Sequence, residues 1–184
     1  MRDPWVMRDS DGEGWIMYFT ARVPRFAEPN AGGAIGFATS PDIVNWTFQK
    51  PIYAGGMFGQ MEVPQVFKHG SKWYMVFCTA GEHFSKAYQK FNPRRIDMGT
   101  HYLVADDHLG PWNLAPGKFL NGSDPCKRYA GKFIEKDGKL FIMGFRCFDE
   151  NGNFIGDVSD PSQVNVDHNG MFSVQEEQTM ANLQ

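Results

Sequence analysis

Two short motifs in the chain place a carboxylic acid beside a proline. Arg2-Asp3-Pro4 stands at the start, and in Glu62-Val63-Pro64-Gln65 the glutamate follows Asp3 by 59 positions. Two carboxyl groups held at one place can share acid–base chemistry, because one can donate a proton while the other stays ionised. These residue types therefore suggest catalysis on a bond that breaks with proton transfer, provided that the fold brings Asp3 and Glu62 together.

The segments that would position these motifs are repeated hairpins. Stretches rich in aromatic and β-branched residues, each preceded by a shorter strand and a Gly-containing turn signal, recur at residues 15–21, 73–80 and 140–146. Aligning Thr20 with Thr79 gives an offset of 59, the same as that between Asp3 and Glu62. We therefore expect Asp3 and Glu62 to occupy equivalent positions in two consecutive repeats.

A second pair of strands is expected after each hairpin, over residues 33–46, 100–112 and 154–166. In each of these segments a strand ends in small or acidic residues, turns, and leads to a shorter closing strand. The pattern predicts an all-β fold, a partial β-propeller of about three four-stranded antiparallel blades in a single domain. The expected limits are 1–184 for the domain, 2–58, 62–120 and 128–174 for the blades, and 175–184 for a tail. A β-sandwich is the alternative, and almost no helix is expected.

Four segments carry a resemblance to a known family. Arg2-Asp3-Pro4 and Glu62-Val63-Pro64-Gln65 open two blades, Tyr129-Ala130-Gly131 opens a third, and residues 35–46 read Ile-Gly-Phe-Ala-Thr-Ser-Pro-Asp-Ile-Val-Asn-Trp. On these segments the chain resembles the five-bladed β-propeller glycoside hydrolases, the group of β-fructosidase/invertase-like and arabinanase/xylosidase-like enzymes. The resemblance covers nearly the whole chain but only the C-terminal three blades of that family.

The resemblance implies a carbohydrate site built around two carboxyl groups. Glu62 matches the family's general acid/base, and Asp3 matches the aspartate that binds sugar hydroxyls and stabilises the transition state. Glycosidic cleavage needs such a pair, because one acid protonates the leaving oxygen while a carboxylate stabilises or attacks the cationic carbon. The first strand of each blade lines the central channel, so both side chains would face one funnel. The expected substrate-binding residues are Arg2, Trp5, Gln65 and Tyr129.

One carboxylate of the family pattern has no counterpart in this chain. The nucleophile or base aspartate belongs to a blade that would precede Arg2, and Asp124 is a remote substitute. The predicted function is therefore a glycoside-hydrolase-like propeller fragment that hydrolyses fructosyl, arabinosyl or xylosyl bonds if it is active. The alternatives are a non-catalytic carbohydrate-binding domain and a structural oligomeric remnant without a ligand.

Three blades also leave two sheet faces uncovered, and large uncovered apolar faces are rare in soluble monomers. We therefore expect a homodimer that completes the propeller, the simplest symmetric assembly, with a partner chain that carries the missing blades as the alternative. The long segment 81–99 is expected to contact the second copy or to lie in solvent, with substrate gating as a further possibility.

Composition argues against several other classes of protein. The net charge of −3 and a pI of about 5.9 leave no basic surface for nucleic acid or a membrane. No apolar stretch has the length of a membrane helix and the N-terminus has no signal-peptide core, so a cytoplasmic protein is expected. The cysteines at 78, 126 and 147 are odd in number and widely spaced, which predicts neither a disulfide framework nor a zinc site. Histidines 83, 101 and 108 show no ligand spacing, so no metal and no cofactor is expected.

Overall fold

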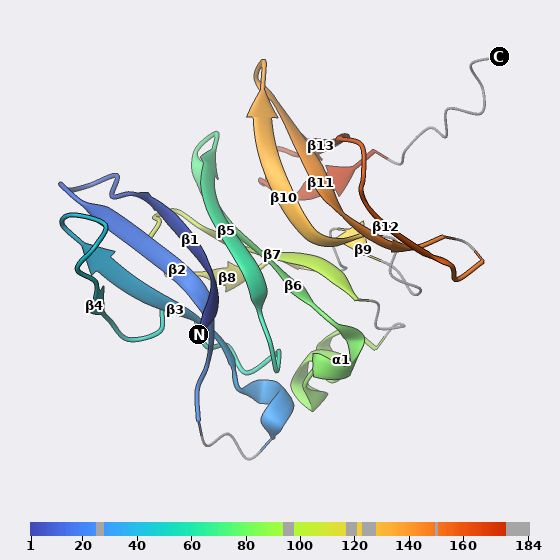
Figure 1. Ribbon diagram of the computed structural model, residues 1–184, viewed down its shortest axis with the longest axis horizontal. Coiled ribbons are helices and arrows are strands. Elements are labelled where there is room, and N and C mark those ends of the chain that lie inside the picture. The colour runs from blue at the N-terminus through green and yellow to red at the C-terminus, as the bar shows by residue number, and fades with distance from the viewer. Residues whose placement is uncertain (25–27, 94–97, 117–120, 123–127, 150, 176–184) are drawn as a thin grey trace.

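The computed structural model describes residues 1–24, 28–93, 98–116, 121–122, 128–149 and 151–175, and the structural statements below refer to these residues. Three antiparallel sheets stand side by side in Figure 1, and each is built from a consecutive part of the chain. We call them blades A, B and C in chain order. They confirm the prediction of an all-β partial propeller.

The strands follow one another along the chain within each blade. Blade A has the order β1 (Arg2–Arg8), β2 (Trp15–Arg22), β3 (Gly33–Ser40) and β4 (Thr47–Phe48). Blade B has the order β5 (Glu62–His69), β6 (Lys72–Thr79), β7 (Gly99–Ala105) and β8 (Asn113–Leu114), with β9 (Asn121–Gly122) also paired to β7. Blade C has the order β10 (Tyr129–Lys136), β11 (Lys139–Phe148), β13 (Ser162–Val166) and β14 (Phe172–Val174), with β12 (Phe154–Val158) paired to β11.

The last half of blade C differs from the sequence prediction. Residues 154–166 were expected to hold the third strand and the closing strand, but β12 and β13 both pair with β11, and the closing strand is β14. The third strand is thus interrupted between Val158 and Ser162. Pro161 lies in this gap, and a proline removes the backbone donor that a continuous ladder needs.

The helices are short, as expected, but the segment 81–99 is not a plain loop. It contains a 3₁₀ turn, Gly81–His83, and the helix α1, Lys86–Phe91, while a further 3₁₀ turn spans Pro29–Ala31. Ser85 caps α1, because its side chain accepts a hydrogen bond from the backbone nitrogen of Tyr88 at 3.0 Å. None of these helices is long and apolar enough to cross a membrane. The predicted cytoplasmic location stays a prediction.

Packing between the blades explains the burial of each sheet. Blade B lies between the other two blades, and seven of the eight residues of β6 are buried, so both of its faces meet protein. The interface between blades A and B includes Ile16, Tyr18, Val66, Met75 and Phe77, and the interface between blades B and C includes Tyr74, Val76, Phe133, Leu140 and Ile142. These two interfaces between stacked sheets bury many of the aromatic side chains of the repeated hairpins.

The outer face of blade C carries exposed apolar side chains, namely Ile134, Phe145, Phe148, Phe154 and Val158. The ring of Phe154 lies 6.2 Å from that of Phe145 and 6.1 Å from that of Phe148, measured between centroids. We call these five residues the blade C patch. Clusters of this kind on a sheet face mark a surface made to be covered.

The cysteines differ from the expectation of unpaired thiols. Cys78 is free and buried, but Cys147 is disulfide-bonded. Cys126 lies outside the described residues. An odd number of widely spaced cysteines does not reveal a pair, because disulfide formation depends on how close two side chains come in the folded chain.

Candidate functional site

The first strand of every blade begins with the same irregularity. The pairing register shifts between Arg2 and Trp5 in β1, and equivalent shifts occur at the starts of β5 and β10. Inside each shift one residue has a positive φ, at 56° for Asp3, 46° for Val63 and 52° for Ala130. Such bulges redirect side chains at the end of a strand, and left-handed backbone in residues with a Cβ is a strained conformation that clusters at functional sites.

The register corrects the predicted equivalence of the two carboxyl groups by one residue. Arg2 pairs with Thr20, and Glu62 pairs with Cys78. Glu62 is therefore equivalent to Arg2, while Asp3 is equivalent to Val63. The expected alignment of Thr20 with Thr79 is also wrong by one position. The bulges of the two blades are alike, and the difference comes from the turns, because six residues separate the paired Arg8 and Trp15 but four separate the paired Lys68 and Trp73. A single offset along the sequence therefore cannot hold for both strands of the hairpin.

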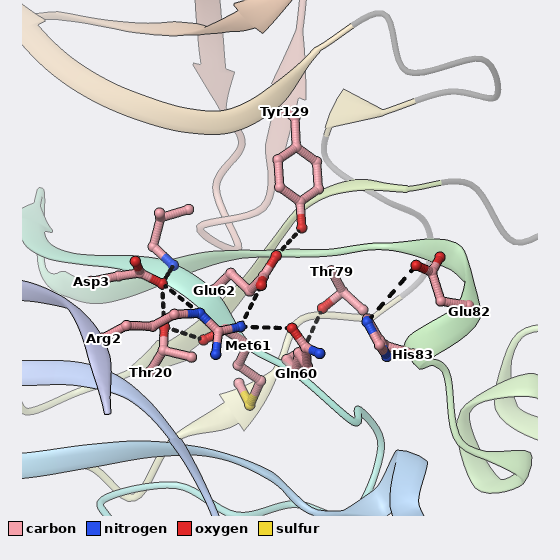
Figure 2. A network of polar contacts seen from close by, with 11 residues as sticks. Arg2, Asp3, Thr20, Gln60, Met61, Glu62, Thr79, Glu82, His83 and Tyr129 are labelled. Atoms are coloured by element: carbon pink, nitrogen blue, oxygen red, sulfur yellow. Dashed lines mark hydrogen bonds and ion pairs between the residues drawn. The ribbon is translucent and has the colours of Figure 1, made fainter. Parts of the chain in front are cut away.

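One residue from the start of each blade converges on the Glu62 carboxylate, as Figure 2 shows. Arg2 of blade A donates from Nη2 to Glu62 Oε1, and Tyr129 of blade C donates from its hydroxyl to Glu62 Oε2. The same Arg2 nitrogen donates to Gln60 Oε1 at 2.7 Å. The Glu62 side chain is 23% exposed, so it is partly shielded yet still reachable from solvent.

Asp3 lies next to this group and is held in place by several hydrogen-bond donors. Its Oδ2 accepts from the Val63 backbone nitrogen at 3.2 Å and lies 3.5 Å from Arg2 Nε. The Thr20 hydroxyl lies 2.9 Å from the same oxygen and 3.0 Å from the Met61 carbonyl, so its single proton serves one of the two at a time. These contacts fix the Asp3 carboxyl group beside Arg2 and the Val63 backbone.

Tyr129 and Lys132 bring two further donors from blade C. Burial, and next the hydrogen bond to Glu62, raise the pKa of Tyr129 above its usual range, so the phenol remains protonated. Burial lowers the pKa of Lys132 from its ordinary value. Its Nζ donates to the carbonyls of Val63 at 2.8 Å and Pro64 at 3.2 Å and lies 5.6 Å from the centre of the Trp5 ring.

Trp5 and Gln65 are equivalent residues that tie neighbouring blades together. Trp5 Nε1 donates to the Val66 carbonyl of blade B at 2.9 Å. Gln65 Nε2 donates to the Phe133 carbonyl of blade C at 2.8 Å, and its Oε1 accepts from the Phe133 nitrogen, also at 2.8 Å. Both polar groups of the Gln65 side chain are thus engaged by backbone of the next blade.

The structure therefore brings four predicted residues into one cluster, which we call the blade-start cluster: Arg2, Asp3, Glu62 and Tyr129. Trp5 and Gln65 lie farther along the same strands. Three contributors were not predicted, namely Thr20, Gln60 and Lys132. No motif marks them, and only their position beside the blade starts reveals their part. Asp124 lies outside the described residues, and within those residues no further carboxylate bonds to Arg2, Asp3 or Glu62.

Comparison with solved structures confirms the resemblance to five-bladed β-propeller glycoside hydrolases. An inulosucrase from Halalkalicoccus jeotgali bound to kestose superposes with a TM-score of 0.77 at 18% identity, covering 94% of this chain and 49% of that one. The levansucrase from Gluconacetobacter diazotrophicus matches at TM-score 0.71 and 17% identity, covering 94% of this chain and 44% of that one. A GH32 β-fructofuranosidase from Bombyx mori matches at TM-score 0.67 and 18% identity, covering 95% of this chain and 36% of that one.

These likenesses establish the fold, and this chain spans about half or less of each matched protein. No protein-family model matches the chain, and no curated protein matches its sequence.

Proposed function

We propose that the blade-start cluster is the acid/base side of a carbohydrate site that cleaves glycosidic bonds, with fructosyl units as the first substrate class and arabinosyl or xylosyl units as the next. The observation that carries this proposal is the convergence of Arg2, Glu62 and Tyr129 from three blades, with Asp3 beside them. Fructosyl substrates come first because solved neighbours include an inulosucrase bound to kestose and a levansucrase complexed with sucrose.

Each residue has a distinct task in this proposal. Glu62 in its acid form donates its proton to the glycosidic oxygen as the carbon–oxygen bond breaks, and Asp3 stabilises the positive charge that develops on the sugar carbon. Tyr129 and Arg2 fix the orientation of Glu62 through one bond to each of its oxygens. Trp5 offers a ring for contact with the sugar, whereas Gln65 holds blade C in place, since its amide is already bonded to Phe133.

Completion of the reaction requires a third carboxylate that attacks the carbon or activates water, and we propose that it comes from outside these three blades. A second copy of the chain, forming a homodimer, would cover the blade C patch and bring its own Asp3 to the same funnel. Light scattering on a size-exclusion column tests this assembly. A mass twice the 20.9 kDa of one chain supports it, and a clean monomer contradicts it.

A second candidate function is carbohydrate binding without turnover. The observation that favours it is that, within the described residues, the blade-start cluster contains only the two carboxylates Asp3 and Glu62. A ring of donors around two carboxylates can bind sugar hydroxyls without completing the chemistry. In the limiting case the chain binds no sugar and is a structural oligomeric remnant.

Substitution Glu62→Gln separates these functions. The unsubstituted chain is incubated with sucrose and kestose, and released fructose and the thermal unfolding temperature are both measured. Hydrolysis by the unsubstituted chain and its loss in Glu62→Gln, with the sugar-induced rise in unfolding temperature retained, support the catalytic function. Glu135→Gln is the matched control, because Glu135 is an exposed residue of β10 paired with His69 at 3.1 Å.

Two outcomes would contradict the catalytic proposal. Sugar-induced stabilisation without any fructose release assigns the chain to binding alone. If sucrose, kestose, and arabinosyl and xylosyl oligosaccharides cause no stabilisation and no sugar is released from them, only the structural remnant remains as a function.

A further inference from the structure

A second polar cluster lies at the opposite end of the interface between blades A and B. The turn from β1 to β2 supplies Asp9 and Asp11, and the turn after β7 supplies Asp107 and His108. Asp9 follows the last residue of β1, whereas the blade-start cluster lies at the first residues of that strand, so the length of a seven-residue strand separates the two sites.

The imidazole of His108 is the centre of this cluster and is 1% exposed. Its Nδ1 lies 3.5 Å from Asp107 Oδ1 and 3.7 Å from Asp11 Oδ2. The Ser10 hydroxyl lies 3.1 Å from the same nitrogen. The other nitrogen, Nε2, is buried and makes no hydrogen bond within the described residues, while Asp9 Oδ1 lies 3.4 Å from it.

The position of the ring is set by contacts that do not involve its nitrogens. The Tyr18 hydroxyl donates to the His108 carbonyl at 3.0 Å, and the Trp73 ring lies 5.3 Å from the imidazole, measured between centroids. Burial of the histidine is therefore a consequence of backbone anchoring and ring packing. Both nitrogens are left facing carboxylate oxygens.

The surroundings of the ring carry excess negative charge. Three carboxylates meet one imidazole, and no Lys or Arg of the described residues forms an ion pair with them. The pKa of Tyr18 is raised by burial first and then by the charges of Asp9 and Asp107, which agrees with a negative potential around this cluster. Carboxylate oxygens of Asp11 and Asp107 lie 3.7 and 3.5 Å from the same ring nitrogen, so a cation placed between these groups would offset the repulsion between the two carboxylates.

We propose that His108 Nδ1, Asp11 and Asp107 bind a divalent cation of the zinc type. Zinc holds nitrogen and carboxylate oxygen ligands at roughly 2.0–2.2 Å, which places tetrahedral ligands about 3.4 Å apart. The separations of 3.5 and 3.7 Å match this geometry, and all three ligand atoms lie within 4.8 Å of one another. Asp11 and Asp107 are exposed, so water completes the coordination.

Asp9 would accept a hydrogen bond from the ring nitrogen of His108 that does not bind the metal. A histidine that binds a metal through one nitrogen nearly always donates its other N–H to a carboxylate or a carbonyl. With the metal on Nδ1, the buried Nε2 carries the proton and faces Asp9 Oδ1. The otherwise unpartnered nitrogen thereby gains an acceptor, and the tautomer that leaves Nδ1 free to coordinate is selected.

The consequence of such a site is a cross-link between two blades. Asp11 belongs to blade A, and Asp107 and His108 belong to blade B, so the ion would join turns that are far apart in the sequence. A ligand that binds only the folded state stabilises it by mass action. The site would therefore raise the stability of the interface between blades A and B without touching the blade-start cluster.

Zinc titration of the whole chain tests the proposal. After removal of metals with a chelator, zinc chloride is added in a calorimeter and the unfolding temperature is recorded with and without the ion. We expect one zinc per chain and a higher unfolding temperature. Asp11→Asn and Asp107→Asn are expected to weaken zinc binding by at least about tenfold each, and Asp9→Asn by about tenfold through the ring. Asp11 is exposed, so the Asp11→Asn variant keeps the fold.

The matched control is Asp106→Asn, which alters an adjacent exposed carboxylate that pairs with Lys72, and it should leave zinc affinity unchanged. Three results would overturn the proposal. The first is an absence of zinc binding to the unsubstituted chain. The second is equal weakening in Asp106→Asn. The third is calcium binding as tightly as zinc, which would exclude a nitrogen ligand.

Discussion

The two ends of the interface between blades A and B are built on opposite principles. At one end, Arg2 and Glu62 occupy the same position of consecutive blades, and Tyr129 occupies it in blade C. At the other end, His108 and its neighbouring carboxylates come from two turns that are not equivalent, one between β1 and β2 of blade A and one after β7 of blade B. Repetition therefore builds one shared site at the blade starts, whereas irregular turns allow a contact that only one pair of blades possesses.

The largest expected effect comes from a substitution that alters only the blade-start cluster. Asp3→Asn removes the charge that would stabilise the transition state but keeps a side chain that tolerates positive φ. Where the chain hydrolyses its sugar, kcat/KM should fall about 10³-fold, or about 4 kcal/mol. Asp137→Asn is the control, since Asp137 has a φ of 53° at a turn far from the site. Retained hydrolysis in Asp3→Asn would remove Asp3 from the mechanism.

The next largest effect is a loss of stability, which tests whether residues near the blade starts also hold the blades together. Gln65→Ala leaves both the nitrogen and the carbonyl of Phe133 without their partner at a buried position. The free energy of unfolding should fall by about 2–4 kcal/mol, because each abandoned buried group loses a hydrogen bond that water does not replace. Urea unfolding followed by tryptophan fluorescence measures this. A loss below about 1 kcal/mol would show that blade C is held by apolar packing alone.

A third prediction compares two buried histidines, His101 within β7 and His108 in the turn that follows it. His101 lies among Phe58, Phe77, Phe84 and Tyr88, and burial lowers its pKa to about 3, from 6.5. Below pH 6.5 the unfolded chain binds a proton that the folded chain excludes until about pH 3, so this histidine makes stability fall as the pH falls through that window. The slope reaches about 1.4 kcal/mol per pH unit.

Urea midpoints between pH 7.5 and pH 4.5 test this fall, with His101→Gln expected to lose it. The control His168→Gln changes an exposed histidine of blade C and should keep it. An unchanged slope in His101→Gln would mean that other groups cause the acid sensitivity. His101 is surrounded by rings and excludes charge, whereas His108 is surrounded by carboxylates and attracts a cation, although both are buried.

The smallest effect concerns the hydrogen bond that joins blades A and B near the blade starts. Trp5→Phe keeps an aromatic ring beside Lys132 but removes the bond from Nε1 to the Val66 carbonyl. We expect a loss of about 1 kcal/mol in the free energy of unfolding, as for one ordinary hydrogen bond. Differential scanning calorimetry resolves a change of this size. A larger loss, equal to that in Gln65→Ala, would show that the Trp5 and Gln65 side chains contribute similarly to stability.

Much of the fold and part of the site could be predicted from the chain itself. Hairpins of aromatic and β-branched residues recur because each blade needs the same inner strands, and this recurrence predicted three blades. The proline-flanked motifs of Arg2, Asp3 and Glu62 predicted where two blades meet. The predicted equivalence failed by one residue, because the turn between the first two strands is two residues longer in blade A than in blade B and one offset was applied to both strands.

Other features depended on distances that a linear order does not contain. The interrupted third strand of blade C, the disulfide of Cys147, and the bonds from Tyr129 and Lys132 all join positions whose spacing is not periodic. The same holds for the cluster around His108, whose histidine showed no ligand spacing because its carboxylate neighbours include residues of another blade.

The amino-acid sequence by itself determined the repeated blades and the chemical types at their starts, since hydrophobic periodicity and turn residues act locally along the chain. Only the tertiary structure decided which side chains meet. Stacking of blade on blade brings Glu62 between Arg2 and Tyr129, and it turns His108 toward Asp9 and Asp11. Contact between separate blades depends on how their sheets pack against one another, and that arrangement is set by the whole buried interface and not by any single segment.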